Sequence, residues 1–222
     1  MPEHLSARLN RSAPLNDDAL QAAISAIDSA NGEDPNVIVF EGRSWPRAQL
    51  QGVRATYWLG ELDTSADPAV TIAARAHHLR RWSVNRSSFP EGRAGYHRWK
   101  REARAAHRAA IEAVLAPLQL PSDVVARAGE FAERTSLTEP GTQLVEDVAC
   151  LVFLETQYDE LIERLGDEKV SDALRKTTRK MSAAAIALSP RAVASGRGRT
   201  AAAHRAAAHG EPGASGFGLD SQ

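Results

Sequence analysis

The sequence has few of the features that indicate a location outside the cytoplasm or a fold held together by disulfide bonds. Cys150 is the only cysteine among 222 residues, so no disulfide can form within the chain. No hydrophobic signal segment and no run of about 18 apolar residues appears. We therefore expect a soluble, cytoplasmic protein that does not enter membranes, with a core built from its 43% of hydrophobic residues.

Strand signals are also scarce. The segment 37–40, Val-Ile-Val-Phe, is the only β-branched run, and it is too isolated to found a sheet. Helix start and stop signals are frequent instead, and they predict helices at 16–31, 44–62, 67–82, 95–118, from 121, from 140 and at 167–188. Short connections between six or seven helices predict an all-α fold, a compact helical bundle.

Composition divides the chain into three parts. Residues 1–15 are expected to be a flexible N-terminus, and residues 16–188 to form a single helical domain. Beyond Ser189 the composition shifts to Gly, Ala, Ser, Pro and Arg, so residues 189–222 are expected to be a disordered tail with too little apolar area to offset ordering entropy. The four arginines of this tail are the one feature that favours nucleic acid, which a net charge of −1 otherwise argues against.

Charge is separated along the chain although it nearly cancels in total. Residues 75–108 carry ten Arg and Lys against two Glu, whereas residues 130–172 carry twelve acidic residues against three basic ones. Guanidinium groups bind phosphate or carboxylate in bidentate fashion. We therefore expect an anionic small molecule, such as a nucleotide, as partner, with internal pairing of the two segments as the alternative.

Imidazoles and carboxylates interrupt segments that are otherwise apolar helix. His107 falls on the inward stripe of a long helix, and Asp147 lies on a helix that is apolar nearly all round, so both are expected to be buried. Of the pair His77 and His78, His78 is the better placed to face the core. Buried groups of this kind need partners, so His78, His107 and Asp147 are candidate metal ligands. The alternatives are a core histidine at position 107 and a structural cap or an arginine pair for Asp147.

The candidate substrate-binding residues are arginines and aromatic residues close in sequence to these ligands. They are Arg80, Arg81, Arg86, Trp82 and Trp99. The tryptophans can stack on a ring, although aromatic residues at helical spacing more often belong to a core. Glu146 and Tyr96 complete the predicted site as catalytic residues.

The Ala-rich segment 72–79 with its His pair, the inward His107 and the later Asp147 together resemble the HD-domain superfamily of metal-dependent phosphohydrolases. That superfamily holds one or two metals with a first His, a His-Asp dyad and a closing Asp. Here His78 replaces the Asp of the dyad, and no His lies between His4 and His77 to act as first ligand. The resemblance implies an HD-domain-like fold and a divalent metal, for which Fe, Mn, Co, Ni and Zn suit such ligands.

A closer resemblance covers most of the chain, from about Asp17 to Leu188. Its motifs are found at residues 26–35, 78–82, 86–90, 95–100 and 146–155. Their order and content resemble the family known as domain of unknown function 4202 (DUF4202). The resemblance implies a helical, HD-like protein and assigns no activity.

Three functional hypotheses follow. The first is a metal-dependent hydrolase of a phosphorylated small molecule, in which metal-bound water is the nucleophile. The second is an HD-like di-iron oxygenase acting on an anionic metabolite, with further ligands such as Glu155. The third is a metal-free binding or scaffold protein in which His78, Arg81 and Asp147 form a structural network, and the missing first His favours it.

Overall fold

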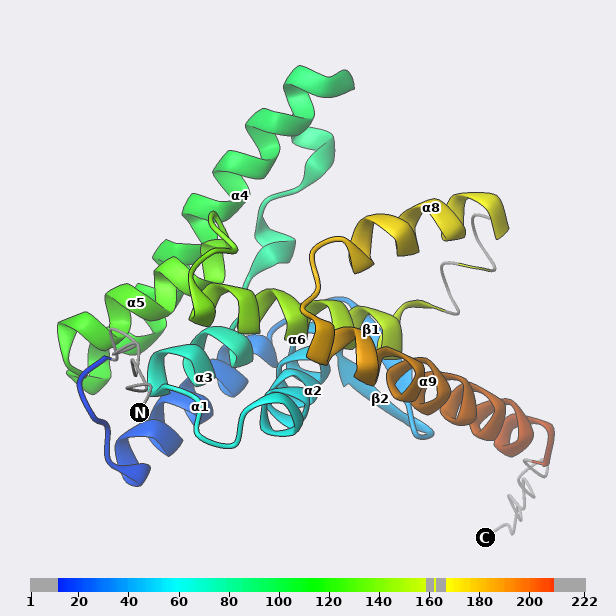
Figure 1. The fold of residues 1–222 in the computed structure, drawn as a ribbon, viewed down its shortest axis with the longest axis horizontal. Coiled ribbons are helices and arrows are strands. Elements are labelled where there is room, and N and C mark those ends of the chain that lie inside the picture. The colour runs from blue at the N-terminus through cyan, green and yellow to red at the C-terminus, as the bar shows by residue number, and fades with distance from the viewer. Residues whose placement is uncertain (1–11, 159–161, 163–166, 210–222) are drawn as a thin grey trace, which may run out of the picture.

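The computed structural model describes residues 12–158, 162 and 167–209, and helices dominate this part of the chain (Figure 1). The helices are α1 (Asp17–Asn31), α2 (Arg47–Leu62), α3 (Pro68–Arg75), α4 (Gly92–Leu115), α5 (Ser122–Glu133), α6 (Pro140–Thr156), α8 (Asp167–Thr178) and α9 (Ala183–His209). Three short 3-10 turns are η1 (Arg81–Ser83), η2 (Arg86–Ser88) and η3 (Ala116–Leu118). The expected all-α class is confirmed. None of the helices in the described ranges is long and apolar enough to cross a membrane.

A β-hairpin is the only sheet in the described part of the chain. β1 (Val37–Phe40) pairs antiparallel with β2 (Arg43–Pro46), and Glu41 and Gly42 form the turn with φ values of 52° and 73°. Positive φ at both central residues is typical of the tight turns that join hairpin strands. The predicted helix start at Ser44 is therefore wrong. α2 begins at Arg47 instead, because the Asp34 carboxylate accepts a hydrogen bond from the Ala48 amide at 2.9 Å.

α6 lies at the centre of the fold, with α2, α3, α5 and α9 packed around it (Figure 1). Buried apolar residues occur on both sides of this helix, as its sequence predicts; Val145, Val148, Leu151 and Val152 are examples. Gly141 allows α5 and α6 to approach closely, since a Cβ at this position would overlap the Phe131 ring. α6 thus joins four of the other helices, which are α2, α3, α5 and α9.

The first half of α4 projects from this body (Figure 1). Segment 81–91 runs beside it and turns into the helix at Gly92, which adopts a φ of 83°. The two are tied together, since Trp99 Nε1 donates to the Val84 carbonyl at 3.0 Å and Gly95 packs directly on the Pro90 backbone. We call residues 81–102 the arm. The predicted helix through residue 82 is wrong, because α3 ends at Arg75.

The first part of the C-terminal segment, residues 189–209, is a continuation of α9. α9 continues past Ser189, Ala192 is buried, and Ser195 Oγ donates to the Glu155 carboxylate at 2.9 Å. Gly196 contacts the Glu155 backbone so closely that a Cβ would overlap its carbonyl oxygen. Small residues make this contact possible. The scarcity of large apolar residues, on which the expectation of disorder rested, does not reveal such a contact. Residues 210–222 of the expected tail lie outside the described residues.

Two further boundaries are corrected. The helix predicted over 167–188 is two helices, because α8 ends at Thr178 and α9 begins at Ala183. The N-terminal segment is anchored from Ser12 rather than flexible to residue 15, since the Ser12 amide and hydroxyl donate to the Asp67 carboxylate at 2.8 and 2.6 Å. Asp67 also caps α3 by accepting from the Ala69 amide, as the sequence predicts. Residues 1–11 lie outside the described part.

The packing of α9 can be tested with two glycine variants. Gly196→Ala is expected to lower the free energy of unfolding by about 1 to 3 kcal/mol, because the new methyl group must displace α9 from α6. Gly60→Ala is the matched control, because a Cβ at this position meets no atom within 4 Å. This substitution changes only the backbone entropy of the unfolded chain. Chemical denaturation measures both. A Gly196→Ala variant as stable as wild type would contradict the docking of α9.

Candidate functional site

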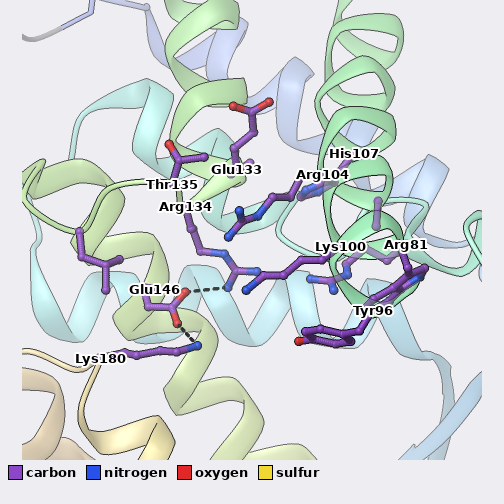
Figure 2. A pocket seen from close by; sticks show the side chains of 14 residues that line it. Arg81, Tyr96, Lys100, Arg104, His107, Glu133, Arg134, Thr135, Glu146 and Lys180 are labelled. Atoms are coloured by element: carbon purple, nitrogen blue, oxygen red, sulfur yellow. Dashed lines mark ion pairs between the residues drawn. The ribbon is translucent and has the colours of Figure 1, made fainter. Parts of the chain in front are cut away.

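A basic pocket of about 410 Å³ opens where the arm meets the end of α5 and the start of α6 (Figure 2). Five cationic side chains line it: Arg81, Lys100, Arg104, Arg134 and Lys180. The carboxylates of its lining are Glu133 and Glu146, and Tyr96, Trp99 and His107 add rings. The pocket therefore holds more positive than negative charge. The five cationic side chains come from different segments of the chain: η1, α4, the end of α5 and the connection between α8 and α9.

One stripe of α4 supplies most of the wall. Tyr96, Lys100, Arg104 and His107 follow each other at spacings of four, four and three residues, so they share one face of the helix. Arg81 comes from η1, after Arg80 has turned the chain with a φ of 51°. Figure 2 shows the cationic ends of Arg81, Arg104 and Lys100 directed into the same space. The geometry of the arm is therefore what brings these charges together.

On the opposite wall, Glu146 of α6 forms ion pairs with two cations, Arg134 and Lys180. Arg134 lies at the C-terminal end of α5, and its Nη1 is 3.3 Å from Glu146 Oε2. Lys180 lies in the connection between α8 and α9, and its Nζ is 3.2 Å from Glu146 Oε1 (Figure 2). The second carboxylate of the lining, Glu133, is turned toward Arg108, 3.8 Å away. Glu146 is thus the carboxylate that faces the cations.

Asp147 holds the connection that carries Lys180. Its Oδ1 accepts from the Ser182 amide at 2.8 Å and from Gln143 Nε2 at 2.9 Å. The same Gln143 amide donates to the Lys180 carbonyl at 2.8 Å. Asp147 is 1% exposed, so its predicted burial is confirmed. Its hydrogen bonds position the start of α9 rather than point into the pocket.

Arg81, Lys100 and Arg104 have no carboxylate within 4 Å among the residues that the structure describes. Desolvation and the nearby Arg134 lower the pKa of Arg81. Desolvation, Arg104 and Lys180 likewise lower the pKa of Lys100. Both shifts combine the cost of burial, which is the larger cause, with repulsion from neighbouring cations. A bound anion would relieve this repulsion.

Buried histidines lie behind the pocket. His107 is 6% exposed, and its Nε2–H donates to the Ala76 carbonyl at 2.6 Å. His77 is 1% exposed, and its Nδ1–H donates to the Ala74 carbonyl at 2.8 Å. Burial lowers the pKa of His107 to about 4 and that of His77 to about 3. Both imidazoles are therefore neutral at pH 7.

The buried member of the histidine pair is His77, whereas the sequence favoured His78. His78 keeps partial exposure, and its ring packs edge-on against His77 with centroids 4.5 Å apart. Desolvation and His77 lower the pKa of His78 well below its ordinary value. The prediction was wrong because it assumed helical rotation at these positions, where the chain has already left α3.

His78, His107 and Asp147 do not assemble into a metal centre. No group of three or more His, Cys, Asp or Glu in the described ranges is placed to hold a metal ion. The metal site that the HD-like resemblance implies therefore stays a prediction.

Half of the ten predicted site residues line the basic pocket: Arg81, Tyr96, Trp99, His107 and Glu146. The other half lie outside its lining: His78, Arg80, Trp82, Arg86 and Asp147. Arg80 instead pairs with Glu33 at 3.3 Å. Arg86 donates to the backbone carbonyls of Phe89 and Pro90, each at 3.1 Å, which stiffens the arm.

Sequence reasoning missed four of the pocket cations: Lys100, Arg104, Arg134 and Lys180. A signal for two of them was present. Steps of three and four residues back from the inward His107 reach Arg104 and Lys100. Arg134 and Lys180 carry no such local signal, because each reaches the pocket through the packing of its own element against α6.

Groups with shifted pKa values near the pocket do not favour acid–base chemistry at neutral pH. With a pKa of about 4, His107 is a weak base. Burial, followed by the neighbouring Glu146, raises the pKa of Cys150 to about 12, so the thiol stays protonated and unreactive. The arrangement is suited to bind and orient an anion.

The buried histidines predict that acid destabilises the fold. The pKa of His107 in the folded state lies below its value of 6.5 in the unfolded chain, so its contribution is complete above pH 6.5 and falls as pH drops toward 4. Full loss of that contribution is on the order of 3 kcal/mol. His107→Gln should flatten the decline of unfolding free energy between pH 6.5 and 4.5. The exposed His97→Gln is the control, and equal slopes for both variants would refute the prediction.

Comparisons with known proteins place the chain in a family without assigning an activity. Neither the curated proteins nor the solved structures contain a match to it. The resemblance to HD domains thus stays a prediction. The family model described as a domain of unknown function, DUF4202, matches residues 21–200, which is well over half of the chain. The chain therefore belongs to the DUF4202 family.

Proposed function

We propose that the protein binds a phosphorylated small molecule, such as a nucleotide, in the basic pocket. The observation that carries this proposal is the set of three cations, Arg81, Lys100 and Arg104, which face the pocket without a carboxylate partner in the described part of the chain. Arg81 and Arg104 are half-buried, and charges that are partly withdrawn from water and left unpaired are costly. Phosphate oxygens match guanidinium and ammonium donors and would supply the missing partners.

The rings of the pocket favour a ligand larger than inorganic phosphate. Tyr96 is 45% exposed and lies 5.7 Å from Trp99 between ring centroids. Trp99 is held in place by its bond to Val84. A fixed tryptophan with an accessible tyrosine beside it suits stacking on a planar ring. The volume of about 410 Å³ also lies in the range typical of small-molecule sites.

Anion binding is the element that the first and second sequence hypotheses share, and the cationic lining of the pocket supports it. Hydrolysis through a metal stays a prediction, because no group of three or more His, Cys, Asp or Glu in the described ranges is placed to hold a metal ion. The oxygenase hypothesis loses a proposed ligand, because Glu155 accepts from Arg54, Trp58 and Ser195. The third hypothesis also stays a prediction, and Asp147 accepts hydrogen bonds from Ser182 and Gln143 rather than from His78 or Arg81.

Arg81→Ala tests the pocket directly. Removal of this half-buried guanidinium should weaken binding of a nucleoside monophosphate by about 1 to 3 kcal/mol, or roughly 10- to 100-fold. Isothermal titration calorimetry measures the affinity. Arg98→Ala is the matched control, because Arg98 is exposed on α4 and does not line the pocket. Failure of phosphate, nucleoside monophosphates and sugar phosphates alike to bind the wild type would overturn the proposal.

Glu146→Gln tests whether the internal carboxylate competes with the ligand. The substitution keeps the side-chain shape and releases Arg134 and Lys180, so affinity for phosphate compounds should rise about 3- to 10-fold. Glu102→Gln changes the same charge on the exposed face of α4 and should have little effect. The same titration serves for both variants. Weaker binding by Glu146→Gln would show that Glu146 is needed by the ligand instead.

A further inference from the structure

A second hollow of about 450 Å³ adjoins the basic pocket. Four residues line both: Lys100, Arg104, Glu133 and Thr135. The second hollow adds His97, Arg101 and Ala105 from the next stripe of α4. We call it the outer hollow. The two hollows therefore meet along Lys100 and Arg104, which can contact a ligand from either side.

The outer hollow extends the uncompensated positive charge. Arg101 is exposed and has no carboxylate within 4 Å among the described residues. Glu133 faces both hollows, but Arg108 lies 3.8 Å from it and offsets its charge. Glu146, the other carboxylate, already bridges Arg134 and Lys180. Along this path the cations thus outnumber the available internal anions.

One phosphate group is too small to engage these cations together. Arg81 lies on one side of Lys100 and Arg104, in the basic pocket, whereas Arg101 lies in the outer hollow. Successive residues 100 and 101 point about 100° apart on a helix, so their charges serve different directions. A phosphate bound at Arg81 would leave Arg101 without a partner. A ligand with phosphates in series would reach both.

We propose that the ligand is a small polyphosphorylated compound, whose phosphates extend from Arg81 over Lys100 and Arg104 to Arg101. This inference rests on the proposed function and specifies its ligand class. A compact polyphosphate is favoured over a nucleic acid strand, because a chain of net charge −1 lacks the overall field that attracts long polyanions. The basic pocket receives the phosphate nearest the ligand's ring, beside Tyr96 and Trp99, and the outer hollow receives the phosphates that follow it.

Titration of the full chain with orthophosphate, pyrophosphate and tripolyphosphate at constant ionic strength tests this inference. Tripolyphosphate is expected to bind at least about 10-fold more tightly than orthophosphate, since each added phosphate gains an ion pair. Arg101→Ala should reduce the tripolyphosphate affinity by about 10-fold and change the orthophosphate affinity less than about twofold. Arg98→Ala, which removes an equal charge outside both hollows, should alter neither.

The outcomes separate this inference from the proposed function. Equal affinity for orthophosphate and tripolyphosphate, or an Arg101→Ala variant that binds tripolyphosphate like wild type, overturns the polyphosphate class and leaves the basic pocket intact. Absence of binding by phosphate compounds of every length overturns both. A different outcome would assign the arm to nucleic acid. In that outcome a single-stranded oligonucleotide binds more tightly than tripolyphosphate, and Arg98→Ala and Arg101→Ala weaken its binding equally. That result also overturns the inference.

Discussion

The carboxylates of α6 impose the condition on which the rest of the structure depends. A carboxylate inside a protein must be matched by donors or cations, because leaving it unpaired costs several kcal/mol. Three such groups lie on this helix, each at most 8% exposed: Glu146, Asp147 and Glu155. Their partners come from α2, from the end of α5, from the connection before α9 and from α9 itself. Meeting these three requirements determines where the C-terminal half of the chain lies, and with it one wall of the pocket.

Small residues make that arrangement possible. Gly141 lets α5 approach α6, Gly52 lets α2 approach the end of α3, and Gly196 lets α9 lie against the Glu155 backbone. Close helix contact brings Ser195 within reach of Glu155 and gains dispersion energy without large side chains. A segment rich in Ala and Gly is therefore part of the core here, although its composition suggests a solvated tail. The docked C-terminal helix and the pocket follow from the same central helix.

Charge separation along the sequence is resolved only in part within the fold. Arg75 pairs with Asp28 and Arg80 with Glu33, so some basic residues are neutralised by α1 and the loop after it rather than by the acidic segment. The acidic segment draws its cations from several parts of the chain: Glu146 pairs with Arg134 and Lys180, Glu155 with Arg54 and Glu133 with Arg108. Arg81, Lys100 and Arg104 are left facing a pocket without a carboxylate partner in the described part of the chain. Internal pairing and anion binding, which were alternatives for the sequence as a whole, thus apply to different residues.

The sequence by itself determined the features that depend on near neighbours. The caps at Asn16 and Asp67, the inward His107 and the two-sided burial of α6 all follow from residues within a few positions. Tertiary structure decided which of His77 and His78 is buried, where Asp147 finds its donors, and which cations meet. These depend on partners more than 30 positions away, such as Ser182 for Asp147. Capping and periodicity act over one or two helical turns, whereas ion pairs and close helix contacts form only after distant elements have packed together.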